Sequence, residues 1–273
     1  MSILNTSNKL ACSFEQLPLY LKIKKDDFVF ISSDLKNIAL NYKKENRKLD
    51  IDLFISNFQL VLSEGTLVIP AYTDNLKDGE TFDIKNSKPT TGALSNKVFK
   101  RKDFKRTFEP LHSVFVWGKD SDEVLNHTEK STFGINSIYS LLFKKNAIFL
   151  FIDVHIVNSF TFIHFIEEKN KVPYRKYFKR NFFLIDEKGI KYSKEILFHT
   201  RKPGVITNFD ELNKKMLETN IMERQSMCNI NIDLINAFET VELVEQLLKN
   251  KKYLYHFSFI DFFKIWIKKM IKK

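Results

Sequence analysis

Short apolar runs and one amphipathic stretch predict the framework of the chain. Residues 28–32 and 66–69 are apolar runs that predict buried strands, the second stopped by Pro70. Between them, apolar positions in residues 49–62 recur at spacings of three and four, which predicts an amphipathic helix. Residues 147–152 predict another buried strand. A strand, a helix and a second strand in this order indicate a parallel crossover connection, so we expect an α/β fold. It would be a three-layer sandwich with a mainly parallel central sheet and ligands near the carboxyl ends of the strands.

Three further segments have patterns of their own. Residues 73–88 are polar and predict a long surface loop. Residues 172–195 predict a β-hairpin that turns at residues 188–189. Residues 158–167 follow a predicted strand and start with helix-capping residue types, so they predict a helix directly after that strand.

Residues 257–273 combine bulky apolar residues with a cluster of lysines, which is typical of a basic amphipathic helix. The ordinary behaviour of such a helix is to dock on the protein core with its lysines in water. The alternative is that it makes a peripheral contact with an anionic membrane.

Composition narrows the class of protein. A length of 273 residues fits one domain that spans residues 1–273. The net charge of +11 favours a polyanionic partner, whether nucleic acid, an anionic membrane or a phosphorylated cofactor such as coenzyme A, without choosing among them. Cys12 and Cys228 lie far apart and match neither a metal site nor a disulfide framework, which indicates a reducing compartment. Without a signal peptide or a long apolar run, we expect a soluble cytoplasmic protein.

His164 is the strongest candidate for acid–base chemistry among the six histidines, because it falls on the predicted helix after a strand. Glu167 follows three residues later and would share its helix face, where the carboxylate could orient the ring. His-x-x-Glu is a common pattern, and by spacing alone a structural pair is the more frequent outcome.

Six segments of the chain carry short motifs in a consistent order, at residues 25–35, 65–73, 89–95, 106–114, 133–137 and 158–175. Together they resemble the aminoglycoside 3-N-acetyltransferase family. The segment from Gly65 to Thr73 is similar to the family's Gly-Thr-Leu-Val-Met-Pro-Thr-x-Thr element. The chain departs from the family at Ser32 and Glu109, which replace histidines, and at Ile138, which replaces proline.

The resemblance implies the family's own α/β sandwich rather than the smaller GNAT fold, acetyl-CoA as donor and no metal. It implies that His164 is the general base and that Glu167 supports it. It also implies a set of binding residues, with Ser33, His112, Ser113 and Ser137 for acetyl-CoA and Thr73 and Asp210 for the acceptor. Alternatives remain for most of these residues: Ser33 and Ser137 could cap helices, Thr73 could end a strand, His112 could stabilise a turn, and Asp210 could interact with a helix dipole.

The acceptor implied by the resemblance is an amine on a sugar. Aminoglycoside sites are acidic whereas this chain is basic, so we expect a nucleotide-linked amino sugar of surface-glycan biosynthesis, with an aminoglycoside-modifying resistance enzyme as the alternative. Two other classes stay open. One is a nucleic-acid-binding protein, for which the chain has no recognised motif, and the other is a catalytically inactive scaffold or membrane-associated subunit. The sequence is compatible with an oligomer and does not specify the oligomeric state.

Overall fold

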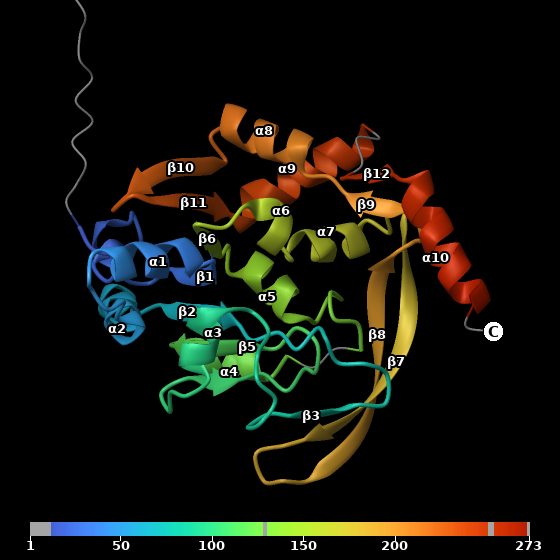
Figure 1. Cartoon of the computed structure of the whole chain (residues 1–273), viewed down its shortest axis with the longest axis horizontal. Helices are drawn as coiled ribbons and strands as arrows, with labels where there is room; N and C mark the ends of the chain where they lie inside the picture. Colours follow the sequence, from blue (N-terminus) through green and yellow to red (C-terminus); the bar gives the residue numbers. More distant parts are fainter. Residues whose placement is uncertain (1–11, 128–129, 251–253, 272–273) are drawn as a thin grey trace, which may run out of the picture.

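The computed structural model describes residues 12–127, 130–250 and 254–271, and a seven-stranded sheet forms its centre (Figure 1). In spatial order the strands are β10 (Met222–Met227), β11 (Ile230–Asn236), β6 (Ile148–Ile152), β1 (Phe28–Ser33), β2 (Thr66–Pro70), β5 (Val114–Gly118) and β4 (Lys105–Arg106). Strand β1 pairs in parallel with both β2 and β6, which confirms the predicted crossover. The outer strands are antiparallel to their neighbours, so the parallel part is the middle of the sheet.

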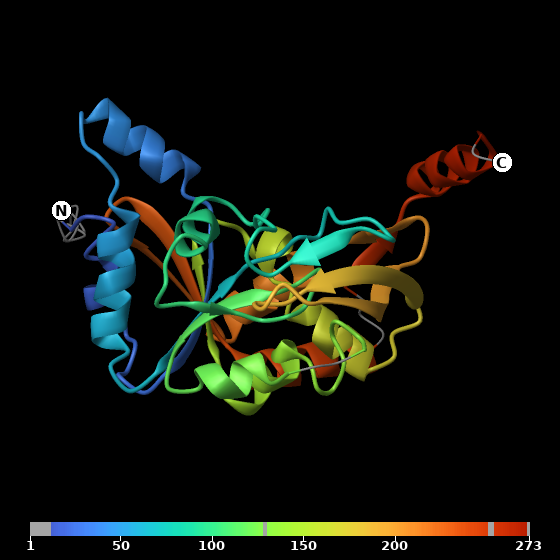
Figure 2. The ribbon, with the colours of Figure 1, turned by 90° about the horizontal axis from the view of Figure 1, so that it is seen from below.

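Helices cover both faces of this sheet (Figures 1 and 2). Alternate side chains of a strand point to opposite faces, and Phe30 of β1 therefore joins one core cluster while Ile31 joins the other. The cluster that contains Ile31 is covered by the 3₁₀ helix η1 (Leu17–Tyr20) and by α1 (Lys36–Lys44), α2 (Ile51–Val61) and α3 (Ala93–Val98). The cluster that contains Phe30 is covered by α4 (Ser121–Leu125), α5 (Ile138–Lys144), α6 (Ile156–Ser159), α7 (Ile163–Lys169), α8 (Asp210–Glu218) and α9 (Ala237–Lys249). The result is a three-layer sandwich.

A long hairpin lies beyond one end of the central sheet (Figure 1). It consists of β7 (Arg175–Ile185) and β8 (Lys191–Arg201), and it confirms the predicted hairpin, although β8 continues further than expected. Asp186 stabilises the predicted turn, because its carboxylate accepts the backbone N–H groups of Lys188 and Ile190, each at 2.9 Å. Within the predicted loop 73–88, β3 (Thr81–Asp83) pairs in parallel with β7.

One of the helices predicted from the sequence agrees with the structure, and another differs from it. The helix predicted at 49–62 is α2, whose N-cap Asp50 accepts the backbone N–H of Leu53 at 3.0 Å. After β6, the predicted single helix is divided into α6 and α7, so Asn158 and Ser159 do not cap it. His155 caps α6 instead, since its ring nitrogen accepts the backbone N–H of Val157 at 3.3 Å.

The expectation that the C-terminal helix docks on the core is wrong. Strand β12 (Tyr255–Phe257) pairs with β9 (Val205–Thr207), and α10 (Phe259–Ile271) then extends away from the body of the protein (Figure 2). Most of its described large apolar side chains are exposed. Among the helices of residues 12–127, 130–250 and 254–271, none combines the length and apolarity needed to cross a bilayer.

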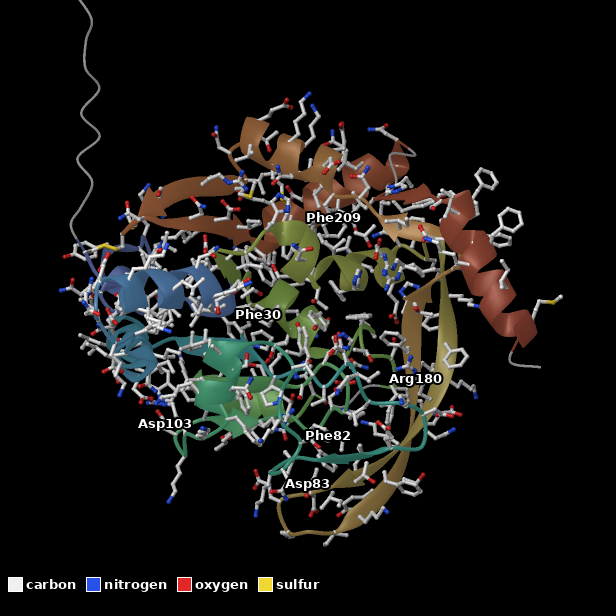
Figure 3. All side chains as sticks on the ribbon, in the orientation of Figure 1. Phe30, Phe82, Asp83, Asp103, Arg180 and Phe209 are labelled. Atoms are coloured by element: carbon white, nitrogen blue, oxygen red, sulfur yellow. A yellow bond between two sulfur atoms is a disulfide. The ribbon has the colours of Figure 1, made fainter. Side chains whose placement is uncertain are left out.

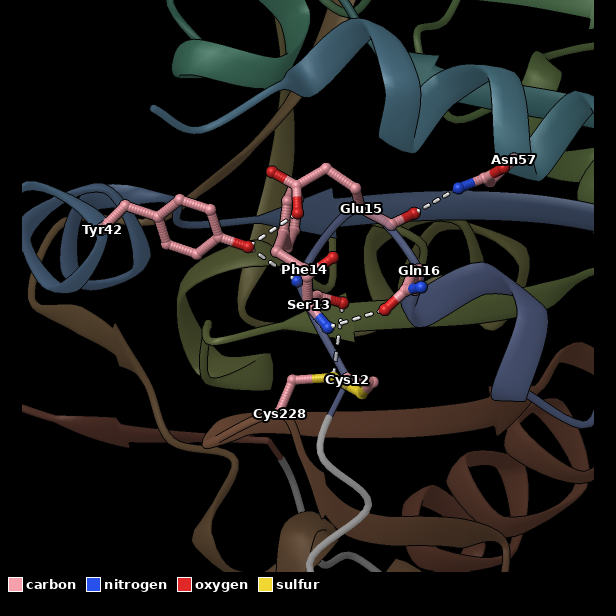
Figure 4. The surroundings of a disulfide bond; sticks show 8 residues. All are labelled: Cys12, Ser13, Phe14, Glu15, Gln16, Tyr42, Asn57 and Cys228. Atoms are coloured by element: carbon pink, nitrogen blue, oxygen red, sulfur yellow. Dashed lines mark hydrogen bonds between the residues drawn. A yellow bond between two sulfur atoms is a disulfide. The ribbon is translucent and has the colours of Figure 1, made fainter. Parts of the chain in front are cut away.

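The expectation of unpaired cysteines is also wrong, because Cys12 and Cys228 form a disulfide (Figure 4). Their Cα atoms are 5.2 Å apart although 216 residues separate them in sequence. The turn between β10 and β11 carries Cys228, and it reaches the N-terminal segment that packs under α1 and α2. There the Tyr42 hydroxyl accepts the backbone N–H of Phe14 at 2.9 Å and donates to Glu15 at 2.7 Å. Only the folded chain brings the two thiols together.

Candidate functional site

A cavity of about 740 Å³ lies at the carboxyl ends of β1 and β2, the position expected for a ligand in a sheet of this type. The hairpin forms its other side. Its lining includes Ser32, Ser33, Asp34, Tyr72, Asp74, Gly92, His112, Phe133, Thr161, His164, Arg175, Phe198 and Arg201. The guanidinium of Arg180, which is labelled in Figure 3, lies 5.0 Å from the ring centre of Phe198 and supports the hairpin wall.

His164 faces this cavity, and its Nδ1 atom belongs to a compact triangle of charged groups. Nδ1 lies 2.8 Å from Oε2 of Glu167 and 3.0 Å from Nη1 of Arg175. The same Nη1 donates to Oε2 of Glu167 at 2.8 Å. A carboxylate only accepts hydrogen bonds, and Nη1 of Arg175 already donates to Glu167, so we assign a proton to Nδ1; the approach of Nη1 to Nδ1 is then a close contact and not a hydrogen bond. The other ring nitrogen, Nε2, then carries the lone pair.

Glu167 is buried, and each of its oxygens has a donor. Oε2 accepts from His164 and Arg175, and Oε1 accepts from the hydroxyl of Tyr174 at 2.8 Å. Arg175 is itself anchored, because Nη2 donates to the backbone oxygen of His199 at 2.7 Å. A buried carboxylate with this many donors stays ionised, and the ring that it contacts has a defined orientation.

Burial, supported by two nearby guanidinium groups, keeps the ring of His164 neutral near neutral pH. Burial lowers the pKa of His164, and the positive charges of Arg175 and Arg201 lower it further, while the hydrogen bond with Glu167 raises it. The pKa of Glu167 is lowered despite its burial, because His164 and Arg175 stabilise the carboxylate. A neutral imidazole with a free lone pair can accept a proton, so the arrangement suits a general base.

His112 lines the cavity beside His164 but in a different environment. Its ring packs against Tyr72 and Phe133, with ring centres 4.8 and 5.1 Å away, and burial lowers its pKa to about 3. Nδ1 of His112 has no hydrogen-bond partner. The turn that carries it is held by Glu109, whose carboxylate accepts the backbone N–H groups of Leu111 and His112. Glu109, which differs from the family motif, therefore shapes the backbone of this wall.

Tyr72 also lines this cavity, and its hydroxyl belongs to a hydrogen-bond network. Its oxygen accepts a hydrogen bond from the hydroxyl of Tyr139 at 2.8 Å, and the hydroxyl of Thr161 also contacts it. Burial raises the pKa of Tyr72 to about 12, so the phenol stays protonated. Since its oxygen already accepts from two neighbours, its own proton is available to a group in the cavity.

The structure brings together only some of the residues predicted for the site. The predicted proximity of His164 and Glu167 is confirmed, and Ser33 and His112 line the cavity with His164. Thr73 lies behind the wall, where its hydroxyl donates to the backbone oxygen of Pro110. The roles of all these residues stay predictions.

The remaining three predicted residues do not line the cavity either. Ser113 is fully buried, donates to the backbone oxygen of Ala71 at 2.7 Å and accepts from Arg106 at 3.1 Å. Ser137 is the N-cap of α5, and Asp210 begins α8 on the exposed surface. Ser113 therefore makes a core contact, Ser137 caps a helix, and Asp210 lies at a helix terminus.

Several cavity residues had no role in the sequence interpretation. Arg175 and Tyr72 lie within the motifs quoted above, so their position in a motif was the available signal. Asp34, Asp74 and Arg201 had no such signal, because only the fold places them at this cavity. No group of three or more metal-binding side chains occurs in the part of the chain that the structure describes.

Comparisons with known proteins give a matching family model and several similar folds. Residues 39–249 match a family model described as aminoglycoside 3-N-acetyltransferase. The YokD protein from Bacillus subtilis has 21% identity and a TM-score of 0.69, over 87% of this chain and 97% of that one. AAC-IIIb in binary complex with CoASH has 13% identity and a TM-score of 0.71, over 91% and 98% of the two chains. AAC-VIa bound to sisomicin has 14% identity and a TM-score of 0.73, over 88% and 98%.

No curated protein sequence matches the chain. The likeness to the solved structures concerns the fold, and it confirms the predicted α/β sandwich of this family rather than the GNAT fold.

Proposed function

The chain belongs to the aminoglycoside 3-N-acetyltransferase family, and we propose on that premise that it transfers the acetyl group of acetyl-CoA to an amine on a sugar, with His164 as general base. The observation that carries this proposal is the triangle of His164, Glu167 and Arg175 at the wall of a cavity. It supplies a neutral imidazole whose Nδ1 side is occupied and whose Nε2 lone pair is unused.

In this reaction the nitrogen of the acceptor attacks the thioester carbonyl while Nε2 of His164 removes a proton from that nitrogen. A C–N bond forms, the C–S bond breaks, and the proton held by His164 passes to the leaving thiolate. The imidazolium that exists between these two transfers is stabilised by Glu167. The ring returns to its neutral form at the end of each turnover.

The negative charge that develops on the carbonyl oxygen requires a hydrogen-bond donor. Tyr72 is our candidate, because its phenol lines the cavity and its oxygen already accepts from Tyr139 and Thr161. Its raised pKa keeps the donor proton in place.

The residues present suit acetyl-CoA. Nδ1 of His112 is a buried polar atom without a partner, in a side chain that lines the cavity, and the pantetheine arm contains amide groups that can pair with it. Arg201 lines the same cavity and is exposed, as a contact for phosphate groups requires. Ser33 adds a hydroxyl beside them.

For the acceptor we propose a nucleotide-linked amino sugar. The carboxylates of Asp34 and Asp74 are the acidic groups of the cavity lining, and the exposed guanidinium of Arg201 is its basic group, because that of Arg175 is paired with Glu167. An acceptor with one amine and several phosphate oxygens would find partners for both in this cavity. An aminoglycoside remains the second candidate, because the related AAC-VIa is a sisomicin-binding protein.

The test is release of free thiol from acetyl-CoA in the presence of a panel of nucleotide-linked amino sugars and of aminoglycosides. We expect turnover with the first group, and a fall of about 100-fold to 10,000-fold in His164→Ala. His127→Ala, on the surface near α4, is the matched control and should keep full activity. Equal turnover in His164→Ala would refute the assigned base, and turnover with aminoglycosides alone would refute the proposed acceptor.

A further inference from the structure

The helix α10 presents apolar side chains to solvent along one side. Phe259, Ile260, Phe263, Ile267 and Met270 are between 49% and 72% exposed, and we call them the α10 apolar face. The intervals between Phe259, Phe263, Ile267 and Met270 are four, four and three residues, so these side chains follow one stripe of the helix. Monomeric soluble proteins rarely leave such a contiguous apolar surface uncovered.

The base of α10 is firmly attached, so its projection is a defined feature of the fold. The backbone N–H of Ser258 donates to the oxygen of Gly204 at 2.7 Å, and the Ser258 hydroxyl caps the helix because it accepts the backbone N–H of Asp261 at 3.2 Å. Gly204 has a positive φ of 79°, and a Cβ there would lie only 2.6 Å from the ring of Phe257. Beyond this attachment the helix leaves the body of the protein (Figures 1 and 2).

An aromatic cavity of about 520 Å³ continues the apolar surface at the base of α10. Its walls include Tyr174, Tyr255, Phe257 and Phe262, and the ring centres of the two tyrosines are 4.2 Å apart. The exposed side chains of Lys176 and Lys202 also line it. Apolar walls with cationic groups beside them match an amphiphile that has an anionic head group.

The charge of the segment decides between two occupants of this surface. Residues 257–273 contain five lysines and one aspartate. A second copy of the chain would bring two segments of the same positive charge together, which opposes pairing. An anionic bilayer attracts them, and each basic residue near such a surface increases binding by roughly fivefold.

We propose that the α10 apolar face, together with the aromatic cavity at its base, docks on the surface of an anionic lipid bilayer. The helix lies in the interface, with its apolar side chains among the acyl chains and its lysines among the head groups. No described helix is suited to span the bilayer, so this contact is peripheral and reversible.

Sedimentation of the full chain with lipid vesicles tests this proposal. We expect binding to vesicles that contain phosphatidylglycerol, none to pure phosphatidylcholine, and release by high salt. Phe263→Ser should reduce binding by about tenfold or more, and Lys264→Glu should reduce it for charged vesicles. Leu60→Ser, an exposed apolar position on α2, is the matched control and should bind as the unmodified protein does.

Two measurements separate this contact from the alternatives. Light scattering reports self-association, and a dimer that Phe263→Ser dissociates, without any vesicle binding, would overturn the proposal in favour of a second copy. Absence of sedimentation with both vesicle types would also overturn it. Acetyl transfer to a soluble acceptor should be unchanged in Phe263→Ser, since this residue is remote from the cavity of His164. The result of the vesicle experiment is therefore independent of whether the proposed acetyl transfer occurs.

Discussion

Arg175 and His164 share one carboxylate oxygen, Oε2 of Glu167, each at 2.8 Å. Their own nitrogens are 3.0 Å apart, so a permanent positive charge lies beside the ring that is proposed to take up a proton. The guanidinium neutralises Glu167 and opposes protonation of His164 in the resting state. It comes from β7, whereas the other two residues come from α7.

Replacing Arg175 should therefore change the pH dependence of the reaction. In Arg175→Gln the carboxylate of Glu167 acts on His164 alone, so the pKa of His164 rises and the base stays protonated to higher pH. The acid limb of the kcat/KM profile should move to higher pH, with a larger loss of activity at pH 6 than at pH 9. The positive charge of Arg175 also lowers the pKa of His112 and that of His199, whereas the effect of Arg201 on the pKa of His164 remains in this variant.

Arg175→Lys is the companion variant because it keeps the positive charge. It should return the acid limb toward its original position even if the maximal rate is lower. A uniform loss of activity at every pH in Arg175→Gln, with an unmoved profile, would mean that Arg175 only holds the hairpin in place.

Tyr72→Phe tests the proposed donor to the carbonyl oxygen. Loss of one such donor typically costs about 100-fold to 1,000-fold in kcat, and KM should change little because the interaction strengthens in the transition state. Tyr192→Phe is the matched control, since Tyr192 is an exposed tyrosine that does not line the cavity. Steady-state kinetics with the folded variants gives the comparison, and an unchanged kcat in Tyr72→Phe would exclude this role.

Reduction of the Cys12–Cys228 disulfide should lower stability without affecting catalysis. Loss of a native disulfide typically costs about 2–5 kcal/mol, and closure of a long loop places this one toward the upper part of that range. Urea unfolding with and without a reductant measures the change, and Cys12→Ser should reproduce it. Because neither cysteine lines the cavity of His164, kcat should stay constant. Identical unfolding curves for both redox states would contradict the prediction.

Stability should decrease on acidification through the buried histidines. Burial lowers the pKa of His112 to about 3 and that of His199 to about 4, from an ordinary value of 6.5. Below pH 6.5 these two histidines are therefore protonated in the unfolded chain while they stay neutral in the folded chain. This contribution is fully present above pH 6.5 and is lost as the pH falls toward these lowered values.

Between these pH values, each of the two histidines lowers the free energy of unfolding by up to about 1.4 kcal/mol for every pH unit. Urea unfolding at pH 7.5 and pH 5 measures the loss, and His112→Gln should show a smaller loss than the unmodified protein. The exposed His127→Gln should behave as the unmodified protein. A loss in His112→Gln as large as in the parent would show that other groups dominate acid sensitivity.

The features that the sequence predicted correctly depend on neighbours along the chain. Strands β1, β2 and β6 and helix α2 follow from runs and spacings of apolar residues. The contact between His164 and Glu167 follows from the three-residue interval on one helix, which brings the two side chains to the same face. Their proximity could therefore be predicted before the fold was known, and their catalytic role stays a prediction.

Tertiary structure alone decided the features that join distant segments. Cys12 and Cys228 meet across 216 residues, and Arg175 reaches Glu167 from a different element. Thr73, Ser113 and Ser137 were chosen by their position in motifs and Asp210 by its position before a predicted helix, yet none of the four lines the cavity. The projection of α10 has the same origin. Periodicity identifies an apolar face on a helix, but what that face contacts depends on the direction in which the chain leaves its last strand.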